Sequence, residues 1–355
     1  MFDLRKVTLY VTSACNLHCS HCYASSGLPM DNELSIDEVR ILLEELYNLG
    51  VFELEFSGGE PFMRHDFLEI LDLANSMDFS LEVLTNGILI DENIANIMKE
   101  LSVRVIQVPL EGLEETHESI RGKGTFHRAI DAIKLLKNAG LKVQVRTTIT
   151  KRSLPDLEPL TKLITSMEVD SFLATEYIPI GRGLGRSDLM LGQEEKDKLK
   201  KSLDFLRISH GPKISIRGDA YGCFESNDDM ANFGESDRSI LCGALRGDWC
   251  GILPNGVVTP CDIIPFYAGS IRLQKMMDIW NNSPVIKTFR QFDPQKLKGA
   301  CGSCSSRVMC GGCRALAFLF YGDFYEEDPM CWKAKNSVLR PPIEVDAGDG
   351  IGIVG

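Results

Sequence analysis

Cys15-Asn16-Leu17-His18-Cys19-Ser20-His21-Cys22 is the stretch around which the rest of the chain is organised. Its cysteines have the spacing C-x3-C-x2-C, and they follow an apolar run, residues 7–11, that is typical of a β-strand. Thiolates at such separations can bind one iron–sulfur cluster. Because three ligands leave one iron of a four-iron cube open, the stretch indicates chemistry on a bound molecule rather than electron storage alone.

A zinc site is the alternative interpretation of these cysteines. Zinc is usually closed at four ligands, so His18 or His21 would have to supply the fourth. The C-x3-C-x2-C spacing behind a strand resembles that of the radical S-adenosylmethionine (SAM) superfamily. The resemblance implies that Cys15, Cys19 and Cys22 hold a 4Fe–4S cluster whose free iron is chelated by the amino and carboxylate groups of SAM. One-electron reduction would then cleave SAM to a 5′-deoxyadenosyl radical, which abstracts hydrogen from a substrate.

Length and composition describe an ordinary globular protein that is large enough for two domains. The chain has 355 residues, of which 44% are hydrophobic and 25% charged. No apolar run approaches the roughly 20 residues that span a bilayer, and residues 1–6 lack the apolar core of a signal peptide. The net charge of −12 argues against nucleic-acid binding, which needs Lys and Arg to displace counterions. With twelve cysteines and no export signal, the protein is expected in the cytoplasm, without a membrane or nucleic-acid partner.

Strand-like and helix-like patterns alternate over the first 180 residues. The expected strands are residues 7–11, 52–56, 81–84, 103–108, 142–149 and 171–178. The expected helices are residues 35–49, with Ser35 as N-cap, 66–77, 91–101, 125–139 and 157–167. Repeated βα units imply a parallel sheet with right-handed crossovers, either open or closed into part of a barrel. The family resemblance selects a partial (β/α)6 TIM-like barrel, an α/β fold in which ligands bind at the carboxyl ends of the strands.

Two turns after the second and third expected strands resemble the family's SAM-binding loops. Gly58, Gly59 and Glu60 form a Gly-Gly-Glu-Pro turn, whose backbone contacts the methionine amino group in the family, with the glutamate in a supporting role. Asn86 lies in a Thr-Asn-Gly segment that helps to close the site over SAM. Taken alone, either segment is also typical of a tight turn without function.

Three further residues are candidates for the same pocket. The family commonly has S-x-D-G after the fourth strand, whereas this chain has Pro-Leu-Glu-Gly with Glu111, which leaves a ribose or substrate contact open. Arg121 lies either near the pocket or in solvent. Arg146, in the fifth strand, points either to the opposite face or into the barrel mouth, where a guanidinium would suit the SAM carboxylate.

The second half of the chain holds a dense cysteine framework after a flexible connector at residues 181–186 and a charged, solvated helix at about 193–208. Closed zinc modules also use C-x2-C pairs, but beside a radical-SAM barrel the pattern resembles the SPASM domain, which carries one or two auxiliary 4Fe–4S clusters. An Asn-Gly hairpin turn is expected at residues 253–258. By resemblance, the first auxiliary cluster would be held by Cys242, Cys261 and Cys313, with or without Cys250, and the second by Cys301, Cys304, Cys310 and Cys331.

These readings predict a barrel at residues 1–190, a bridging helical region at 191–240, a SPASM domain at 241–335 and a flexible tail at 336–355. Cys223 falls outside the cluster pattern. It is either a buried or free thiol or an acid near the substrate. The resemblance implies a radical SAM oxidoreductase, and we expect its substrate to be a ribosomally made peptide or protein, with a leader-binding module on a separate chain. A tetrapyrrole of a haem-type pathway is the alternative substrate, and a non-enzymatic electron carrier is a third reading. Reducing electrons would come from a donor such as flavodoxin or ferredoxin.

Overall fold

The structure, a computed structural model, describes residues 3–219, 241–263, 266–331 and 333–334. It divides into two compact units, which are described separately. One unit comprises Lys6–Gly218 with Ile252–Gly256, and the other comprises Met1–Arg5, Asp219–Gly251 and Val257–Gly355. The expectations for Cys223 and for the tail at residues 336–355 lie outside the described residues.

The first unit is a curved sheet of βα repeats. Its strands follow one another in sequence order: β1 (Lys6–Tyr10), β2 (Glu53–Ser57), β3 (Ser80–Leu84), β4 (Val105–Pro109), β5 (Val143–Ile149), β6 (Ser171–Glu176) and β7 (Ser215–Asp219). The pairs from β1 to β6 are all parallel. This order confirms the partial barrel and brings the carboxyl ends of six strands to one edge.

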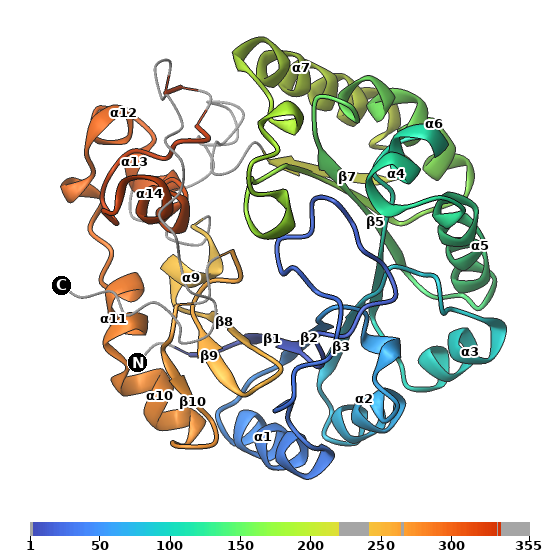
Figure 1. Cartoon of the computed structure of the whole chain (residues 1–355), viewed down its shortest axis with the longest axis vertical. Coiled ribbons are helices and arrows are strands. Elements are labelled where there is room, and N and C mark those ends of the chain that lie inside the picture. Colours follow the sequence, from blue (N-terminus) through green and yellow to red (C-terminus); the bar gives the residue numbers. More distant parts are fainter. Residues whose placement is uncertain (1–2, 220–240, 264–265, 332, 335–355) are drawn as a thin grey trace. The chain divides into compact units, whose positions relative to one another are not determined.

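Helices cover the outer face of the sheet (Figure 1). They are α1 (Ile36–Asn48), α2 (Phe67–Ser76), α3 (Glu92–Glu100), α4 (Glu114–Arg121), α5 (Thr125–Asn138), α6 (Leu157–Ser166) and α7 (Gln193–His210). Ser35 caps α1 as predicted, because its side chain accepts from Glu38 N while the Glu38 carboxylate accepts from Ser35 N. The expected solvated helix is α7, which instead buries Leu199, Leu203 and Leu206 within the barrel unit.

Alternation along the strands separates an apolar outer face from a polar inner face. Phe56 is fully buried and meets Phe67 of α2 edge-on, with ring centroids 5.8 Å apart. Its neighbour Glu55 points to the other face, where Lys6 binds both Glu55 and Glu82 at 2.7 Å. The loop that follows β1 also lies on this inner side of the sheet, away from the helices (Figure 1).

The second unit is built from short elements. Its strands are β8 (Trp249–Ile252), β9 (Val257–Thr259) and β10 (Gly269–Ser270), in the order β10-β9-β8. The predicted hairpin turn joins β8 to β9, with Gly256 at φ +85°, and its residues Ile252–Gly256 are grouped with the first unit. The helices are α9 (Gly243–Arg246), α10 (Met276–Asn282), α11 (Pro284–Arg290), α12 (Gly299–Gly302), α13 (Arg307–Cys310) and α14 (Arg314–Tyr321).

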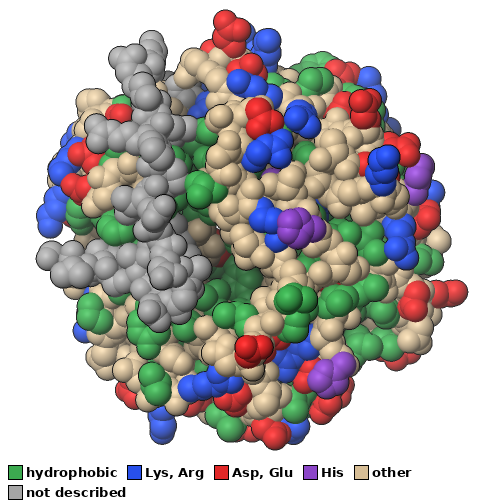
Figure 2. All heavy atoms as spheres, in the orientation of Figure 1, with side chains coloured by type: hydrophobic (Ala, Val, Ile, Leu, Met, Phe, Trp, Pro, Cys, Tyr) green, Lys and Arg blue, Asp and Glu red, His purple; other side chains and the backbone are tan. Residues whose placement is uncertain are grey.

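The face of the molecule in Figure 2 is of mixed charge. On the face in Figure 2, basic and acidic side chains are interspersed, and neither sign gathers into a patch over the described residues. Among the residues that the structure describes, no helix is both long and apolar enough to cross a membrane.

Candidate functional site

The cysteine loop lies directly against the Gly-Gly-Glu turn, with no side chain between the two backbones. Gly59 N donates to Thr12 O at 2.8 Å, and Glu60 N donates to Ala14 O at 2.7 Å. A Cβ on Gly59 would lie 2.1 Å from Ala14 O, and one on Gly58, at φ +143°, would lie 2.3 Å from Thr12 O. Only glycine permits this approach, so the two glycines fix where the cysteine loop leaves β1.

Glu60 joins this turn to the Thr-Asn-Gly segment. Its carboxylate is fully buried and accepts from Thr85 Oγ1 and Asn86 N, both at 2.7 Å, and from Phe62 N at 3.3 Å. Burial raises the pKa of Glu60 to about 7, although these three donors act to lower it. The buried carboxylate therefore positions both turns at the strand ends.

Asn86 reaches from β3 to the start of the cysteine loop. Its Nδ2 donates to Asn16 Oδ1 at 2.7 Å and lies 3.9 Å from Cys15 Sγ. Asn86 N is held by Glu60, so the side chain is aimed at the cysteines by the same carboxylate that orders the turn.

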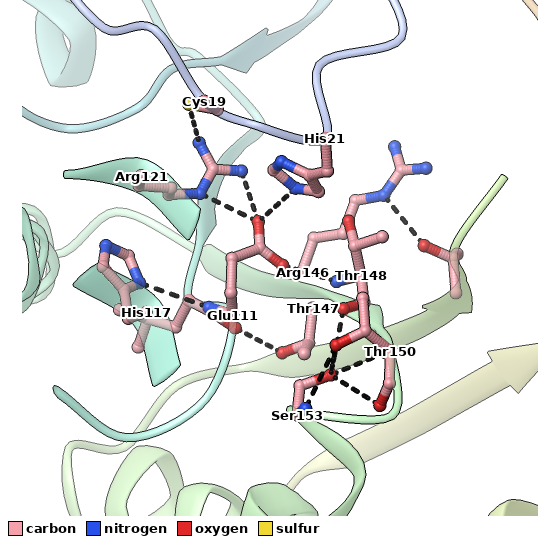
Figure 3. Close-up of polar contacts among 12 residues, drawn as sticks. Cys19, His21, Glu111, His117, Arg121, Arg146, Thr147, Thr148, Thr150 and Ser153 are labelled. Carbon is pink, nitrogen blue, oxygen red and sulfur yellow. Dashed lines mark hydrogen bonds and ion pairs between the residues drawn. The ribbon is translucent and has the colours of Figure 1, made fainter. Parts of the chain in front are cut away.

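Glu111 is the centre of a buried polar cluster at the end of β4 (Figure 3). Its Oε1 accepts from His21 Nε2 at 3.0 Å and from Arg121 Nε and Nη2 at 2.8 and 2.5 Å, while Oε2 accepts from Thr148 N at 2.7 Å. Burial alone raises the pKa of Glu111, but Arg121 and His21 outweigh it and hold that pKa well below the usual range. Both Glu111 oxygens are thus bound within the protein.

Arg121 connects this cluster to the cysteines. It belongs to α4, a helix that the sequence analysis did not predict, and its side chain is 14% exposed. Its Nη1 lies 3.7 Å from Cys19 Sγ. Burial lowers the pKa of Arg121, but Glu111, Cys19 and Cys22 together raise it by more, so the net shift is upward. The structure therefore places the Arg121 side chain beside the cysteine loop and not in solvent.

His21 takes part in the cluster through one ring nitrogen. Its Nε2 donates to Glu111, while Nδ1 is buried without a hydrogen-bond partner among the described residues. Over the part of the chain that the structure describes, no three His, Cys, Asp or Glu side chains are grouped so as to hold a single metal ion, and the zinc interpretation gains no support from the structure.

Arg146 lies on the inner face of β5. Its Nε is 3.4 Å from Thr175 Oγ1 of β6. Figure 3 shows the guanidinium directed toward the same edge of the sheet as His21. The sequence left two directions open for the Arg146 side chain, and in the structure the side chain points toward the barrel mouth.

Arg182 is a site residue that the sequence reading missed. Its Nε and Nη1 donate to Cys19 O at 3.0 Å and Ser26 O at 2.6 Å, and its backbone N donates to Cys22 O at 3.0 Å. A Cβ on the neighbouring Gly181, at φ +56°, would lie 2.2 Å from Tyr23 O. The expected flexible connector is therefore a short 3-10 turn that clamps the cysteine loop. The signal available in the sequence was an arginine between two glycines at a strand end.

The three thiols of the loop lie close enough to affect one another. Burial raises the pKa of Cys15, and Glu60, Cys19 and Cys22 raise it further. Burial also raises the pKa of Cys19, which Arg121 counteracts. Thiols that repel one another as anions form the donor set that a cationic iron–sulfur core stabilises. Three cysteines from one loop therefore fit such a cluster.

Four thiols of the second unit border one cavity. Cys301, Cys304, Cys310 and Cys331 line it together with Asp328. Burial raises the pKa of Cys301 to about 11, and Cys331 acts in the same direction. Among the described residues, no three His, Cys, Asp or Glu side chains converge closely enough to hold a single metal ion. Thiols spread around a cavity suit a polynuclear cluster better than a zinc ion.

The other cysteines of this unit fall into two environments. The pKa of Cys313 is raised well above its usual value by burial, with contributions from Asp328, Cys261 and Cys242. Cys250 is fully buried in β8, and burial raises its pKa while Arg290 lowers it. Its thiol is thus influenced by α11 rather than by the other cysteines.

Comparisons with known proteins agree with this geometry. A family model described as the Radical SAM superfamily matches residues 9–163, and the SPASM model, described as an iron–sulfur cluster-binding domain, matches residues 242–305. The chain is 30% identical over 352 residues to an AdoMet-dependent heme synthase of Methanosarcina barkeri, covering 92% of this chain and 96% of the relative. It is 32% identical over 336 residues to the mycofactocin maturase MftC of Mycobacterium tuberculosis, covering 92% and 82%.

Solved structures share the fold at lower identity. SuiB of Streptococcus suis, solved with its precursor peptide SuiA, has a TM-score of 0.74 at 18% identity, covering 91% of this chain and 74% of that one. The anSMEcpe enzyme with bound AdoMet also has a TM-score of 0.74, at 19% identity, covering 93% and 94%. The matching family models and full-length relatives, together with the barrel and its cysteine loop, show that this chain belongs to the radical SAM superfamily and is a radical SAM enzyme with a SPASM domain.

Proposed function

We propose that Cys15, Cys19 and Cys22 hold the 4Fe–4S cluster at which this enzyme cleaves SAM in order to oxidise a substrate. With cluster and SAM bound, the site supplies a 5′-deoxyadenosyl radical that abstracts hydrogen. The observation that carries the proposal is the position of three cysteines on one loop at the carboxyl edge of the sheet, fixed there by the bonds of Gly59 N, Glu60 N and Arg182 to the loop backbone. The Gly58–Glu60 turn and Asn86 lie against that loop.

The surrounding residues orient SAM. Arg146 is the residue we assign to the SAM carboxylate, since a guanidinium binds carboxylates in a bidentate manner and its side chain is directed to this edge. The backbone of Gly58 and Gly59 is assigned to the methionine amino group. Glu60 and Glu111 act through their neighbours, because their oxygens already accept from protein donors.

We assign the cysteines of the second unit to two auxiliary clusters. Cys301, Cys304, Cys310 and Cys331 share a cavity, which supports one cluster. The mutual effects of Cys242, Cys261 and Cys313 support the other. Cys250, influenced by Arg290, is the least supported ligand, and without it the first auxiliary cluster has three cysteine ligands among the described residues.

For the substrate we propose a tetrapyrrole of a haem-type pathway. The heme synthase relatives support this class because the chain covers 96% of one of them at 30% identity. A ribosomally made peptide is the second candidate, supported by the 32% identity with a mycofactocin maturase. The proposed enzyme works in the cytoplasm, where thiols stay reduced, and takes electrons from a flavodoxin or ferredoxin.

The test is an anaerobic turnover assay. The reconstituted enzyme is supplied with SAM and dithionite, and 5′-deoxyadenosine is quantified with and without an iron-coproporphyrin or a candidate precursor peptide. We expect deoxyadenosine from the wild type, none from Cys19→Ala, and an increase with the correct substrate class. Clusters that load fully, yet give neither deoxyadenosine nor a SAM-dependent change in the EPR spectrum, would contradict the proposal.

A further inference from the structure

Arg314 is a buried cation within the cysteine framework. It begins α14 directly after Cys313, is 2% exposed and is one of the largest fully buried side chains of the described residues. A buried guanidinium that lacks compensation costs several kcal/mol. The groups around Arg314 therefore show which negative charge compensates the guanidinium.

The acceptors of Arg314 are backbone carbonyls and one cysteine sulfur. Its Nη1 donates to Phe324 O and Glu326 O at 2.9 and 2.5 Å, and its Nε lies 3.5 Å from Gly312 O. Its Nη2 lies 3.8 Å from Cys301 Sγ. The carbonyls fix the orientation of the guanidinium and do not cancel its charge, so the positive field reaches the thiol.

Asp328, a carboxylate that borders the same cavity, is held by other donors. Asp328 is fully buried, and its Oδ2 and Oδ1 accept from Cys313 N at 2.7 Å and Met330 N at 2.9 Å. Its own backbone N donates to Cys301 Sγ at 3.3 Å. Asp328 thus partly offsets the cation and adds a second donor to the same sulfur.

A second cysteine of the cavity also receives two donors. Cys304 Sγ accepts from Ser306 N at 3.4 Å and lies 3.9 Å from Lys333 Nζ. Positive charge and hydrogen bonds to the sulfurs both favour the reduced, more negative form of an iron–sulfur cluster. The backbone donors and the cations around this cavity therefore both favour the reduced form of a cluster bound there.

Arg121, beside the SAM-site cysteines, provides a contrast. It lies 3.7 Å from Cys19 Sγ, but Glu111 accepts from two of its nitrogens. Its charge is compensated by an ionised carboxylate at contact distance. The two arginines are placed alike relative to sulfur and differ in how far their charge is cancelled.

We propose that Arg314 is the counter-cation of the cluster held by Cys301, Cys304, Cys310 and Cys331, and that its charge raises the reduction potential of that cluster. The inference rests on the proposed function in one respect, that these four cysteines hold a cluster. Arg314 is a positioning and tuning residue and takes no part in the chemistry of SAM.

The test is an EPR-monitored redox titration of the full-length, fully reconstituted enzyme. The signal of this cluster is identified by its loss in Cys304→Ala. In Arg314→Gln we expect four irons to remain in the cluster. Its midpoint potential should become more negative by about 59 mV, which corresponds to a tenfold loss in affinity for one electron. Arg314→Lys keeps the charge and should keep most of the potential.

Arg290→Gln is the matched control. Arg290 is also buried, at 7% exposed, and donates to Trp280 O at 2.7 Å, but it does not border the cavity. Its loss should destabilise the unit and leave this midpoint in place. An unchanged midpoint in Arg314→Gln, or equal shifts in Arg314→Gln and Arg314→Lys, overturns the inference.

A second variant decides the case in which Arg314→Gln fails to load the cluster. Lys333 is exposed, so Lys333→Gln is expected to fold and to move the midpoint negative by a smaller amount that shrinks with added salt. No shift in that variant also overturns the inference. If instead the wild type lacks the signal that Cys304→Ala should remove, the cluster assignment itself has failed.

Discussion

At the scale of single residues, the site depends on buried charges that are matched within the protein. Glu111 is fully buried and ionised because Arg121, His21 and Thr148 N all donate to it. Breaking a buried ion pair by removing one partner costs about 3–5 kcal/mol. The same change would leave the Arg121 charge uncompensated beside Cys19.

Glu111→Gln is therefore expected to have two effects. It should lower the melting temperature markedly, and it should move the midpoint of the SAM-site cluster to a more positive potential, because Arg121 then acts unopposed. Thermal unfolding and an EPR redox titration measure these effects. Glu114→Gln is the control, since that carboxylate pairs with His127 on the surface and is 56% exposed. A wild-type midpoint potential of the SAM-site cluster in Glu111→Gln would show that the Arg121 charge does not affect the cluster.

The buried imidazole of His117 should make the stability of the protein depend on pH. It is 1% exposed, and its Nδ1 accepts from Glu111 N at 3.2 Å. Burial, with help from Arg121, lowers the pKa of His117 to about 3. The unfolded chain binds the proton at a pKa of about 6.5, so the stabilisation is complete above pH 6.5 and is lost as the pH falls toward 3, by about 1.4 kcal/mol per unit.

The measurement is the urea unfolding midpoint between pH 4.5 and 8. His117→Asn keeps an acceptor near Nδ1 without titrating, so its midpoint should fall less steeply with acid than that of the wild type. His127→Asn, at a side chain that is 68% exposed, should keep the wild-type slope. Parallel curves for His117→Asn and the wild type would count against the buried neutral histidine.

At the scale of elements, the joined backbones of the cysteine loop and the glycine turn matter most. A Cβ on Gly59 would lie 2.1 Å from Ala14 O, and a carbonyl fixed by its hydrogen bond to Glu60 N cannot yield without moving the loop. We expect Gly59→Ala to lose one cluster per chain and all SAM cleavage, and to retain the auxiliary clusters. Iron, labile sulfide and deoxyadenosine assays measure this.

Gly27→Ala is the matched control in the same loop. No heavy atom lies within 4 Å of a Cβ at Gly27, and its N and O bonds to Ser13 O and Cys15 N are backbone bonds that alanine keeps. This variant should load its full iron content. Equal iron in the two alanine variants would mean that the loop tolerates displacement.

At the scale of the whole molecule, a substitution in the second unit should leave SAM cleavage by the barrel unit intact. Cys304→Ala removes one thiol from the cavity of the second unit and leaves all cysteines of the barrel unit in place. We expect it to cleave SAM in the absence of substrate at the wild-type rate and to form no product. Deoxyadenosine and product are quantified in parallel, and full product formation would reduce that cluster to a structural role.

Sequence patterns predicted much of this architecture, and what they missed has physical causes. The six strands and the capped helix at Ser35 follow from periodicity and capping, which are local. Helix α4 was missed because eight mostly polar residues give little apolar signal. The burial of Arg314 and the contacts of Arg182 were not predictable, because arginine usually lies on the surface and their partners are set by the tertiary fold. The relatives support both substrate classes that the sequence suggested.

Arg182 also constrains when the site can mature during synthesis. It contacts Cys19 O across 163 residues of chain, so the cysteine loop is not fully fixed until β6 and the turn at Gly181–Gly183 have left the ribosome. A nascent chain that exposes only its first cysteines offers loose thiols that are open to oxidation or to stray metals. We therefore expect cluster delivery late in biogenesis, and chains that end before Arg182 should emerge without iron.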